Sequence, residues 1–389
     1  MSWRNKIIKN TPKVRLESIK TLVCGTYKSG KTRWWKEITE LHYLNPEEET
    51  LLLAWEKGYE TWELQSVIPI IEEGNEVAQW EFFRNVVVKG LVEEAKSGRK
   101  VKLIGWDTVD RAIDACTAWV IYDASRRYGK QFTSLQDITE STSENGWDLL
   151  YKELKRQVDA LDNAKYGQAF LAWTKEKETT LYNGLKYNSL ELMMNSTGRK
   201  VFESQSSLIC CLFNEVKVFD KEGNEINENI KDKKGRERAS NFHETRVVML
   251  FRPNEYVSIA GGRYTNLPEE PVEYSAENFL KVFETAVQGQ LKKTNKTVDE
   301  LKDEEAKEAD QKAKEYAERI EQEEQVKELI EKIKNEVERL QNQPDTKSLI
   351  TEKAVPKFKE IFETTVDYKK VNDVNKLQQA FEYISSLGK

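Results

Sequence analysis

Histidine and cysteine are scarce in this sequence of 389 residues, which has two histidines and four cysteines. Metal sites built from several histidines and triads that need a histidine base are therefore not expected. The cysteines form no C-x-x-C pair and stand among apolar neighbours; they are Cys24, Cys116, Cys210 and Cys211. We interpret them as reduced core residues of an intracellular protein, not as a disulfide or zinc framework.

Long apolar runs are also missing. The longest, residues 208–213, is far too short to span a bilayer. The N-terminus is basic, but no apolar signal-peptide region follows it. These patterns predict a soluble, cytoplasmic protein.

The chain carries an excess of acidic residues, with 61 Lys and Arg against 67 Asp and Glu and a net charge of −6. The excess is concentrated in residues 299–340, which hold 16 acidic and nine basic side chains. The remainder is close to neutral and can still display basic loops. Overall acidity therefore does not exclude a nucleic-acid partner.

Residues 25–32 form a complete G-x-x-x-x-G-K-[ST] phosphate loop, with an apolar strand predicted before it and a helix after it. In such a loop, backbone N–H groups surround the β-phosphate and the lysine reaches the β- and γ-phosphate oxygens. The hydroxyl of the last residue is placed to ligate Mg²⁺. The predicted nucleotide-binding residues are Gly25, Thr26, Tyr27, Lys28, Ser29, Gly30, Lys31 and Thr32. The pattern predicts binding of ATP with Mg²⁺.

Residues 17 to about 270 alternate short apolar runs with amphipathic stretches, which predicts an α/β domain with a mainly parallel sheet. The expected strands are 19–24, 50–55, 102–106, 168–173, 207–213, 246–251 and 256–260. The expected helices are 31–42, 77–97, 108–127, 146–164 and 275–290. Residues 176–205 and 220–243 are expected to be loops, because they are polar and contain turn signals.

A long charged helix is expected from about 295 to 342, because the segment is rich in Glu, Lys and Ala and lacks Gly and Pro. Its second half places six apolar residues on one face, which would suit a weak dimeric coiled coil: Val326, Leu329, Ile330, Ile333, Val337 and Leu340. Two short apolar-faced helices are expected after Pro344. We therefore predict a P-loop ATPase domain at 1–272, a helical linker at 273–343 and a small helical domain at 344–389.

Two carboxylates could complete the phosphate loop. Asp107 ends an apolar strand, which suits a Walker B residue holding Mg²⁺ together with Thr32; it could instead cap the next helix. Glu56 also ends an apolar strand. If that strand lies beside the phosphate-loop strand, Glu56 faces the γ-phosphate and can orient the attacking water. It could equally be an ordinary surface residue, so the candidate catalytic set is Lys31, Glu56 and Asp107.

Further candidates rest on single features of the sequence. Thr174 and Lys175 end the fourth strand, where polar groups could sense the γ-phosphate, although an ordinary strand end with a solvated lysine is an equally good interpretation. Arg263 follows two glycines and could act as an arginine finger in a neighbouring subunit, although such an arginine is more often a turn residue. Basic residues that could contact a nucleic-acid backbone, or simply be solvated, are Arg199, Lys200, Lys233, Lys234, Arg236 and Arg238.

The order of these elements resembles the RecA-like ATPases of bacteriophages, in particular the Sak-type single-strand annealing group. The resemblance spans roughly residues 17–270 and rests on the phosphate loop followed by five further segments. These are Leu52–Glu56, Gly105–Thr108, Asn145–Asp148, Phe170–Glu176 and Arg252–Pro268.

The resemblance implies a RecA-like core that hydrolyses ATP, forms homo-oligomers and acts on single-stranded DNA in phage recombination or replication, in the host cytoplasm. It implies that Glu56 activates water, that Asp107 is the Walker B acid and that residues 176–205 face DNA. Relatives often have a histidine where this chain has Thr174. The acidic helix and the C-terminal region lie outside the core, and the latter could recruit a single-strand-binding protein.

Two other classes of function stay open at this point. One is a P-loop kinase of a nucleotide or small metabolite, which would require an arginine-rich lid over the phosphates. The other is a nucleotide-binding scaffold without turnover. The intact Lys31, Thr32 and Asp107 favour an ATPase.

Overall fold

A computed structural model of the chain describes residues 3–7, 10–220, 222–226, 230–231, 237–238, 242–291, 296–343 and 346–387. The contacts divide the chain into two compact units, Met1–Lys312 and Ala313–Lys389. The divisions after residues 272 and 343 that the sequence indicates stay predictions. Within the described residues, no helix is both long and apolar enough to cross a membrane.

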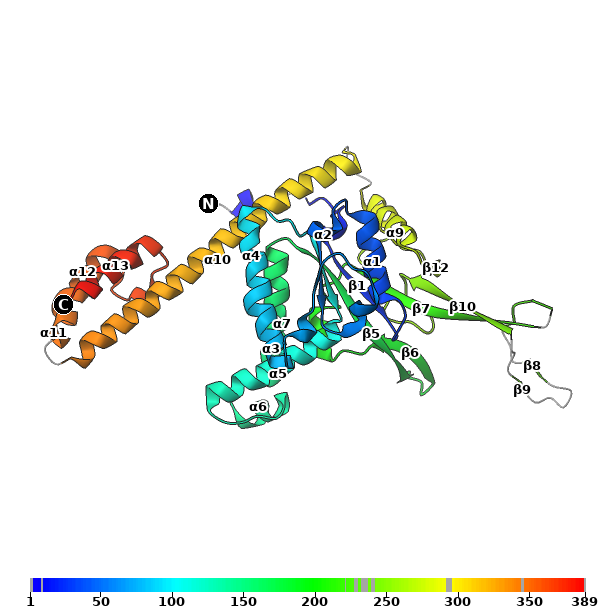
Figure 1. The fold of residues 1–389 in the computed structure, drawn as a ribbon, viewed down its shortest axis with the longest axis horizontal. Coiled ribbons are helices and arrows are strands. Elements are labelled where there is room, and N and C mark those ends of the chain that lie inside the picture. The colour runs from blue at the N-terminus through cyan, green and yellow to red at the C-terminus, as the bar shows by residue number, and fades with distance from the viewer. Residues whose placement is uncertain are drawn as a thin grey trace. The chain divides into compact units, whose positions relative to one another are not determined.

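A sheet forms the centre of the first unit, in the order β12-β10-β7-β1-β5-β4-β2-β3 (Figure 1). The strands from β7 to β3 in this order run parallel, whereas β10 and β12 are antiparallel to their neighbours. The strands on this path are β1 (Lys20–Gly25), β2 (Thr50–Ala54), β3 (Val67–Ile68), β4 (Leu103–Asp107), β5 (Gly167–Thr180), β7 (Leu208–Phe219), β10 (Phe242–Leu250) and β12 (Val272–Glu273). Strand β6 (Lys186–Leu192) pairs with β5, and β11 (Gly261–Gly262) pairs with β7. The mainly parallel α/β fold that the sequence predicts is confirmed.

Helices cover both faces of this sheet (Figure 1). One layer contains α3 (Glu76–Phe82), α4 (Val88–Ser97), α5 (Val109–Tyr128) and α7 (Gly146–Asn163), which contact one another. On the other side, α1 (Lys31–His42) packs against α9 (Ala276–Gln290). The shorter helices are α2 (Pro46–Glu49), α6 (Leu135–Ser141) and α8 (Ser196–Val201). Because both faces are covered, the central strands are mostly apolar, and β2 and β4 are buried over their full length.

Tryptophan and phenylalanine fill much of the core, which explains the high tryptophan count. Trp106 packs against Trp55 and Phe83, and on its other side against Phe170 and Phe202. All five side chains are almost fully buried. Aromatic pairs in this distance range add packing energy beyond the apolar area that they bury.

The segment 176–205 is not the loop that its polarity predicts. Strand β5 continues to Thr180, β6 returns beside it, and α8 follows. The outer part of the hairpin, residues 175–188, is largely exposed, so it has charged residues instead of an apolar alternation, whereas Leu190 and Leu192 near its base are buried. Cross-strand ion pairs such as Lys177–Glu191 and Lys186–Glu178 take the place of apolar contacts.

One further expectation about the sheet is wrong, and the condition stated for Glu56 is not met. Residues 256–260 make only an isolated bridge between Val257 and Leu190 and do not form a strand. Strand β2 is not beside β1, because β5 and β4 lie between them. A short apolar run therefore does not guarantee a strand, and it does not predict the neighbours of a strand that does form.

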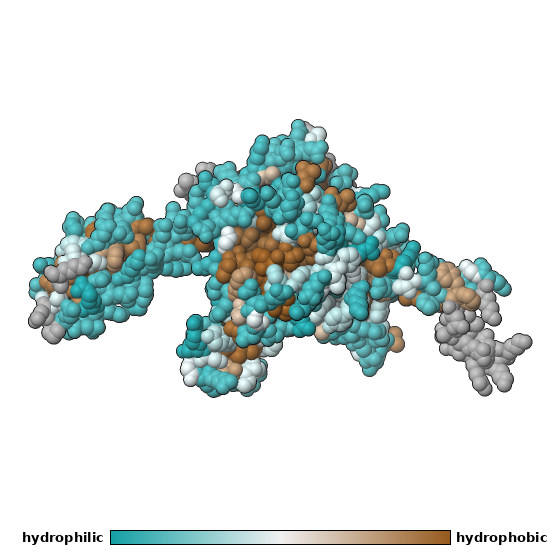
Figure 2. Space-filling model, viewed as in Figure 1, coloured by the Kyte–Doolittle hydropathy of each residue, from teal (hydrophilic) through white to brown (hydrophobic). Residues whose placement is uncertain are grey.

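The second unit consists of the C-terminal part of α10 (Val298–Asn342) with α11 (Lys347–Leu349), α12 (Val355–Phe362) and α13 (Val374–Ser386). Its core joins Ile333 of α10 to Phe358 of α12 and Leu377 of α13. Hydrophilic residues dominate its visible surface (Figure 2). The apolar face of α10 that suited a coiled coil is therefore covered within the unit itself.

Candidate functional site

The phosphate loop joins β1 to α1, in the strand–loop–helix arrangement that the sequence predicts. Gly30 is the N-cap of α1 and has φ +97°, a conformation that L side chains rarely adopt. At Gly25 a Cβ would lie 2.3 Å from Ser29 Oγ and 2.7 Å from the carbonyl oxygen of Leu212. Both glycines are therefore required by the local geometry of this loop.

Lys31 begins α1 and folds back over the loop. Its Nζ donates hydrogen bonds to the carbonyl oxygens of Gly25 at 3.1 Å and Thr26 at 2.9 Å. Burial lowers the pKa of Lys31, while the nearby carboxylates of Asp107 and Glu56 oppose that shift. The ammonium group thus lies at the phosphate loop with two carboxylates close enough to affect its charge.

Asp107 and Thr32 are in direct contact although 75 positions separate them. Thr32 Oγ1 donates a hydrogen bond of 2.6 Å to Asp107 Oδ2. Asp107 is buried at the end of β4, and burial raises its pKa against the effects of Thr32 and Lys31. Its second oxygen, Oδ1, has no hydrogen-bond partner in the part of the chain that the structure describes. A hydroxyl beside a carboxylate with a free oxygen is a suitable donor pair for Mg²⁺.

Glu56 follows β2 and reaches the same place although β5 and β4 lie between β2 and β1. A Cβ built at Gly58 would lie 3.7 Å from Thr32 Oγ1 and 3.8 Å from Glu56 Oε1, so both oxygens border one small space. Burial, and then the charge of Asp107, raises the pKa of Glu56 to about 7, while Lys31 and Arg111 act in the opposite direction. A carboxyl group with a pKa near neutrality is well suited to accept a proton from water.

Two more buried polar groups, from α5 and β5, flank the backbone of Trp173, which is the register partner of Gly25 in the phosphate loop. Asp110 lies in the first turn of α5, and its Oδ2 accepts a 2.8 Å hydrogen bond from the backbone N–H of Trp173. The Thr174 hydroxyl is buried without a hydrogen-bond partner among the described residues. Thr174 was among the predicted residues, whereas Asp110 was missed. Its spacing of three from Asp107, at the start of a helix, is the signal that could have suggested it.

The structure does not bring the other predicted residues to this site. Lys175 is exposed, immediately beyond Thr174. Arg263 follows β11 at the amino-terminal edge of the parallel strands, opposite the phosphate loop, where its Nη2 donates to Ser204 O at 3.0 Å. Arg199 is paired with Glu203.

Lys200, which was predicted together with Arg199 to contact nucleic acid, is exposed in α8. The remaining predicted basic residues lie in the segment after β7. Lys233, Lys234 and Arg236 fall outside the described residues. Arg238 belongs to β9 (Glu237–Arg238), which pairs with β8 (Ile230–Lys231).

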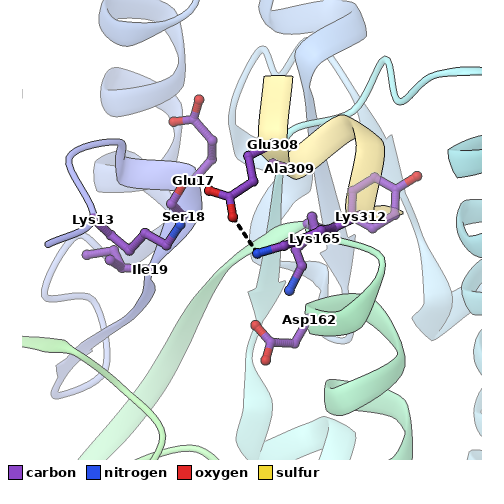
Figure 3. A pocket seen from close by; sticks show the side chains of 10 residues that line it. Lys13, Glu17, Ser18, Ile19, Asp162, Lys165, Glu308, Ala309 and Lys312 are labelled. Atoms are coloured by element: carbon purple, nitrogen blue, oxygen red, sulfur yellow. Dashed lines mark hydrogen bonds and ion pairs between the residues drawn. The ribbon is translucent and has the colours of Figure 1, made fainter. Parts of the chain in front are cut away.

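A separate cavity of about 240 Å³ lies by the amino ends of β1 and β5 and is not part of this site (Figure 3). Most of the charged side chains that line it form ion pairs with other residues of the chain. Glu308 contacts Lys312 at 2.5 Å, and Asp162 contacts Lys20 at 2.8 Å. We interpret it as a junction between the core and the start of α10.

Whether the site suits a nucleotide with Mg²⁺ can be judged from its unsatisfied polar atoms. Asp107 Oδ1, Ser29 Oγ and Thr174 Oγ1 are all buried without partners among the described residues. Buried polar groups normally have partners, so such a gathering at a phosphate loop fits a site made for a polar ligand. No group of three or more His, Cys, Asp or Glu that could hold a metal occurs in the described part of the chain. Mg²⁺ is commonly bound through one or two protein groups plus substrate phosphates and water, so the donors present fit.

The fold and this site define a P-loop NTPase domain that binds ATP. A family model for the AAA domain matches residues 17–254, more than half of the chain, and the chain belongs to that family. Comparison with curated proteins gives no match.

Proposed function

We propose that this chain hydrolyses ATP and couples the reaction to single-stranded DNA, in phage recombination or replication. The observation that carries the hydrolysis proposal is the position of Glu56. Its carboxylate borders the same space as the Thr32 hydroxyl, which is itself bonded to Asp107. A kinase has to exclude water from its phosphates, whereas this site holds a base suited to activating water.

Each residue then has a distinct role in the proposed reaction. Bound ATP with Mg²⁺ supplies the γ-phosphate and the metal charge. The Lys31 ammonium, released from the carbonyl oxygens that it contacts, neutralises phosphate oxygens. Thr32 and Asp107 hold the metal, Glu56 takes a proton from the attacking water, and Thr174 contacts the γ-phosphate side.

The DNA part of the proposal is supported by the β5–β6 hairpin, which extends from the same edge of the sheet as the phosphate loop. Tyr182 is fully exposed at its tip, and Leu185 and Tyr187 are also exposed. Exposed aromatic rings are the platforms on which single-stranded bases stack. The resemblance to the Sak-type annealing group, whose DNA-facing loop would correspond to residues 176–205, points to the same segment.

Assembly and partners complete the proposal. We propose that the chain forms homo-oligomers in which Arg263 reaches the nucleotide of a neighbouring subunit. Its backbone N–H is bonded to Ser207 O at 2.9 Å and it sits on an exposed turn. The second unit is proposed to recruit a single-strand-binding protein.

The test is ATP hydrolysis by the full chain with and without single-stranded DNA, alongside Lys31→Ala. The proposal expects turnover that DNA stimulates and that the substitution abolishes. Turnover that DNA leaves unchanged would contradict the DNA part alone. Transfer of phosphate to a nucleotide or metabolite would instead identify a kinase, and nucleotide binding without turnover would identify a scaffold.

A further inference from the structure

Strand β5 runs beyond the end of its neighbour β4, and the sheet needs another hydrogen-bond acceptor there. The pairing of β4 with β5 ends with Asp107 opposite Leu171. Trp173 lies two residues past this point, and its N–H donates to Asp110 Oδ2 at 2.8 Å. The Asp110 carboxylate thus joins α5 to β5 just where β4 has ended.

Trp173 is also the point at which three other elements meet. Its carbonyl oxygen accepts a 2.9 Å hydrogen bond from the N–H of Met193, which follows β6. Its ring lies 4.8 Å from the ring of Tyr27 in the phosphate loop, and the Arg111 guanidinium lies 5.0 Å from its centroid. Tyr27 in turn donates its hydroxyl to Met193 Sδ at 3.4 Å. A shift of Trp173 would therefore reach the phosphate loop directly.

The carboxylate that holds Trp173 is unusual for a purely structural group. Asp110 is 7% exposed, and its Oδ1 has no hydrogen-bond partner among the described residues. Leaving such an oxygen unsatisfied costs stability, because a buried polar atom has lost its water. Burial raises the pKa of Asp110 to about 6, and the Trp173 N–H and Lys31 oppose that shift.

We propose that Asp110 is a positioning residue of the nucleotide site: by holding the Trp173 N–H, it fixes the Thr174 hydroxyl and the Trp173–Tyr27 contact against the phosphate loop. The inference rests on the proposed hydrolysis. Asp110 acts through Trp173 and Thr174 and does not itself contact the reacting atoms.

Two substitutions distinguish the hydrogen bond that Asp110 accepts from the negative charge that it carries. Asp110→Ala removes the acceptor, whereas Asp110→Asn keeps an oxygen of the same shape that can still accept the Trp173 N–H. We expect Asp110→Ala to lower kcat at least about tenfold, because small misplacements of site groups have large effects on rate. We expect its Kd for ATP to stay within about threefold of wild type, because the phosphate-loop donors are unchanged. Asp110→Asn should restore most of kcat, and Asp148→Asn, which removes an exposed carboxylate from α7, serves as the control.

A second readout needs no nucleotide. Hydrogen exchange at the Trp173 amide should be slow in the wild type and in Asp110→Asn, and fast in Asp110→Ala. If Asp110→Ala does not fold, Asp110→Asn still tests the inference through its protected amide and retained kcat.

Three results would overturn the inference: wild-type kcat in Asp110→Ala, an equal loss in both variants, or a raised Kd with kcat unchanged. A wild-type chain that binds ATP without turnover would contradict the proposed hydrolysis instead.

Discussion

Replacing Glu56 by Gln tests the chemistry of the site most specifically. The substitution keeps the size of the side chain and removes its ability to take a proton from water. The Lys31, Thr32 and Asp107 contacts do not involve the Glu56 side chain in direct hydrogen bonds. ATP should therefore still bind, while hydrolysis should be lost.

The magnitude follows from what a general base contributes. A positioned base typically accelerates a reaction by about 10²–10⁴-fold. At about 1.36 kcal/mol for each factor of ten, this corresponds to about 3–5 kcal/mol of transition-state stabilisation. We expect kcat to fall by at least about 10²-fold in Glu56→Gln.

The pH dependence gives an independent signature, since the pKa of Glu56 is raised to about 7, chiefly by burial. Only the deprotonated carboxylate can act as a base, so wild-type kcat should rise as pH increases through about 7 and then level off. The small residual rate of Glu56→Gln should lack this rise.

The assay is phosphate release at saturating ATP and Mg²⁺ from pH 5.5 to 9, with nucleotide affinity measured in parallel. Glu60→Gln is the matched control, because Glu60 lies in the same segment with an exposed side chain, paired only at 3.9 Å with Lys57. A Glu56→Gln protein with wild-type kcat would refute the assignment of the base. So would a variant that loses ATP affinity and turnover together.

Four further outcomes are expected. Asp107→Asn should weaken Mg²⁺-dependent ATP binding by about tenfold or more, because a charged metal donor is lost. A Mg²⁺ titration of ATP binding measures this, and an unchanged Mg²⁺ dependence would argue against Asp107 as a metal ligand. Tyr182→Ala should weaken binding to single-stranded DNA by about 1–3 kcal/mol, measured by fluorescence anisotropy; equal affinity would remove the hairpin from the DNA site. Gly105→Ala should destabilise the first unit by about 1–3 kcal/mol, because its Cβ would lie 2.7 Å from the Trp35 ring; an unchanged urea midpoint would contradict this packing. Glu17→Gln should remove about 3 kcal/mol of stability at pH 7, because the pKa of Glu17 is lowered to about 2, with burial outweighed by the hydrogen bond to His42 and by Arg15. That stability is present above about pH 4.5 and lost as the pH falls through about 2. The difference between wild type and variant in urea titrations should therefore be less than about half its pH 7 value at about pH 3 and should vanish below about pH 2.

The phosphate loop and the strands around it were predictable because their signals are local. Gly25 and Gly30 are set by the turn itself, and the apolar runs that became β1, β2 and β4 are buried on both faces. Local patterns of this kind survive folding because the chain neighbours that create them stay neighbours. The caps behave similarly, as Asn145 shows by accepting hydrogen bonds from the N–H groups of Trp147 and Asp148 at the start of α7.

The parts that the sequence did not predict depend on the order of the strands in the sheet and on which segments are exposed to solvent. The role of Glu56 was made to depend on its strand lying beside β1, yet Glu56 reaches the site from β2 across two intervening strands. The contact between Asp110 and Trp173 joins residues 63 positions apart. The outer part of the β5–β6 hairpin lacks an apolar alternation because it is largely exposed to solvent, so its charged residues predicted a loop.

The suggested coiled coil shows a related limit: an apolar face can be predicted from the sequence, but the surface that covers it cannot. The apolar face of α10 was recognisable, including Ile333 and Leu340, but periodicity alone does not identify the surface that covers it. In the structure this face packs on α12 and α13 of its own chain.

Release of inorganic phosphate from ATP by the full chain tests the central claim most directly. The account predicts Mg²⁺-dependent turnover in the wild type, none in Lys31→Ala, and none in wild type when Mg²⁺ is removed by chelation. Turnover that persists in Lys31→Ala would contradict the assignment of this loop as the reacting site. A wild-type chain that binds ATP with Mg²⁺ and never releases phosphate would contradict the claim of hydrolysis itself.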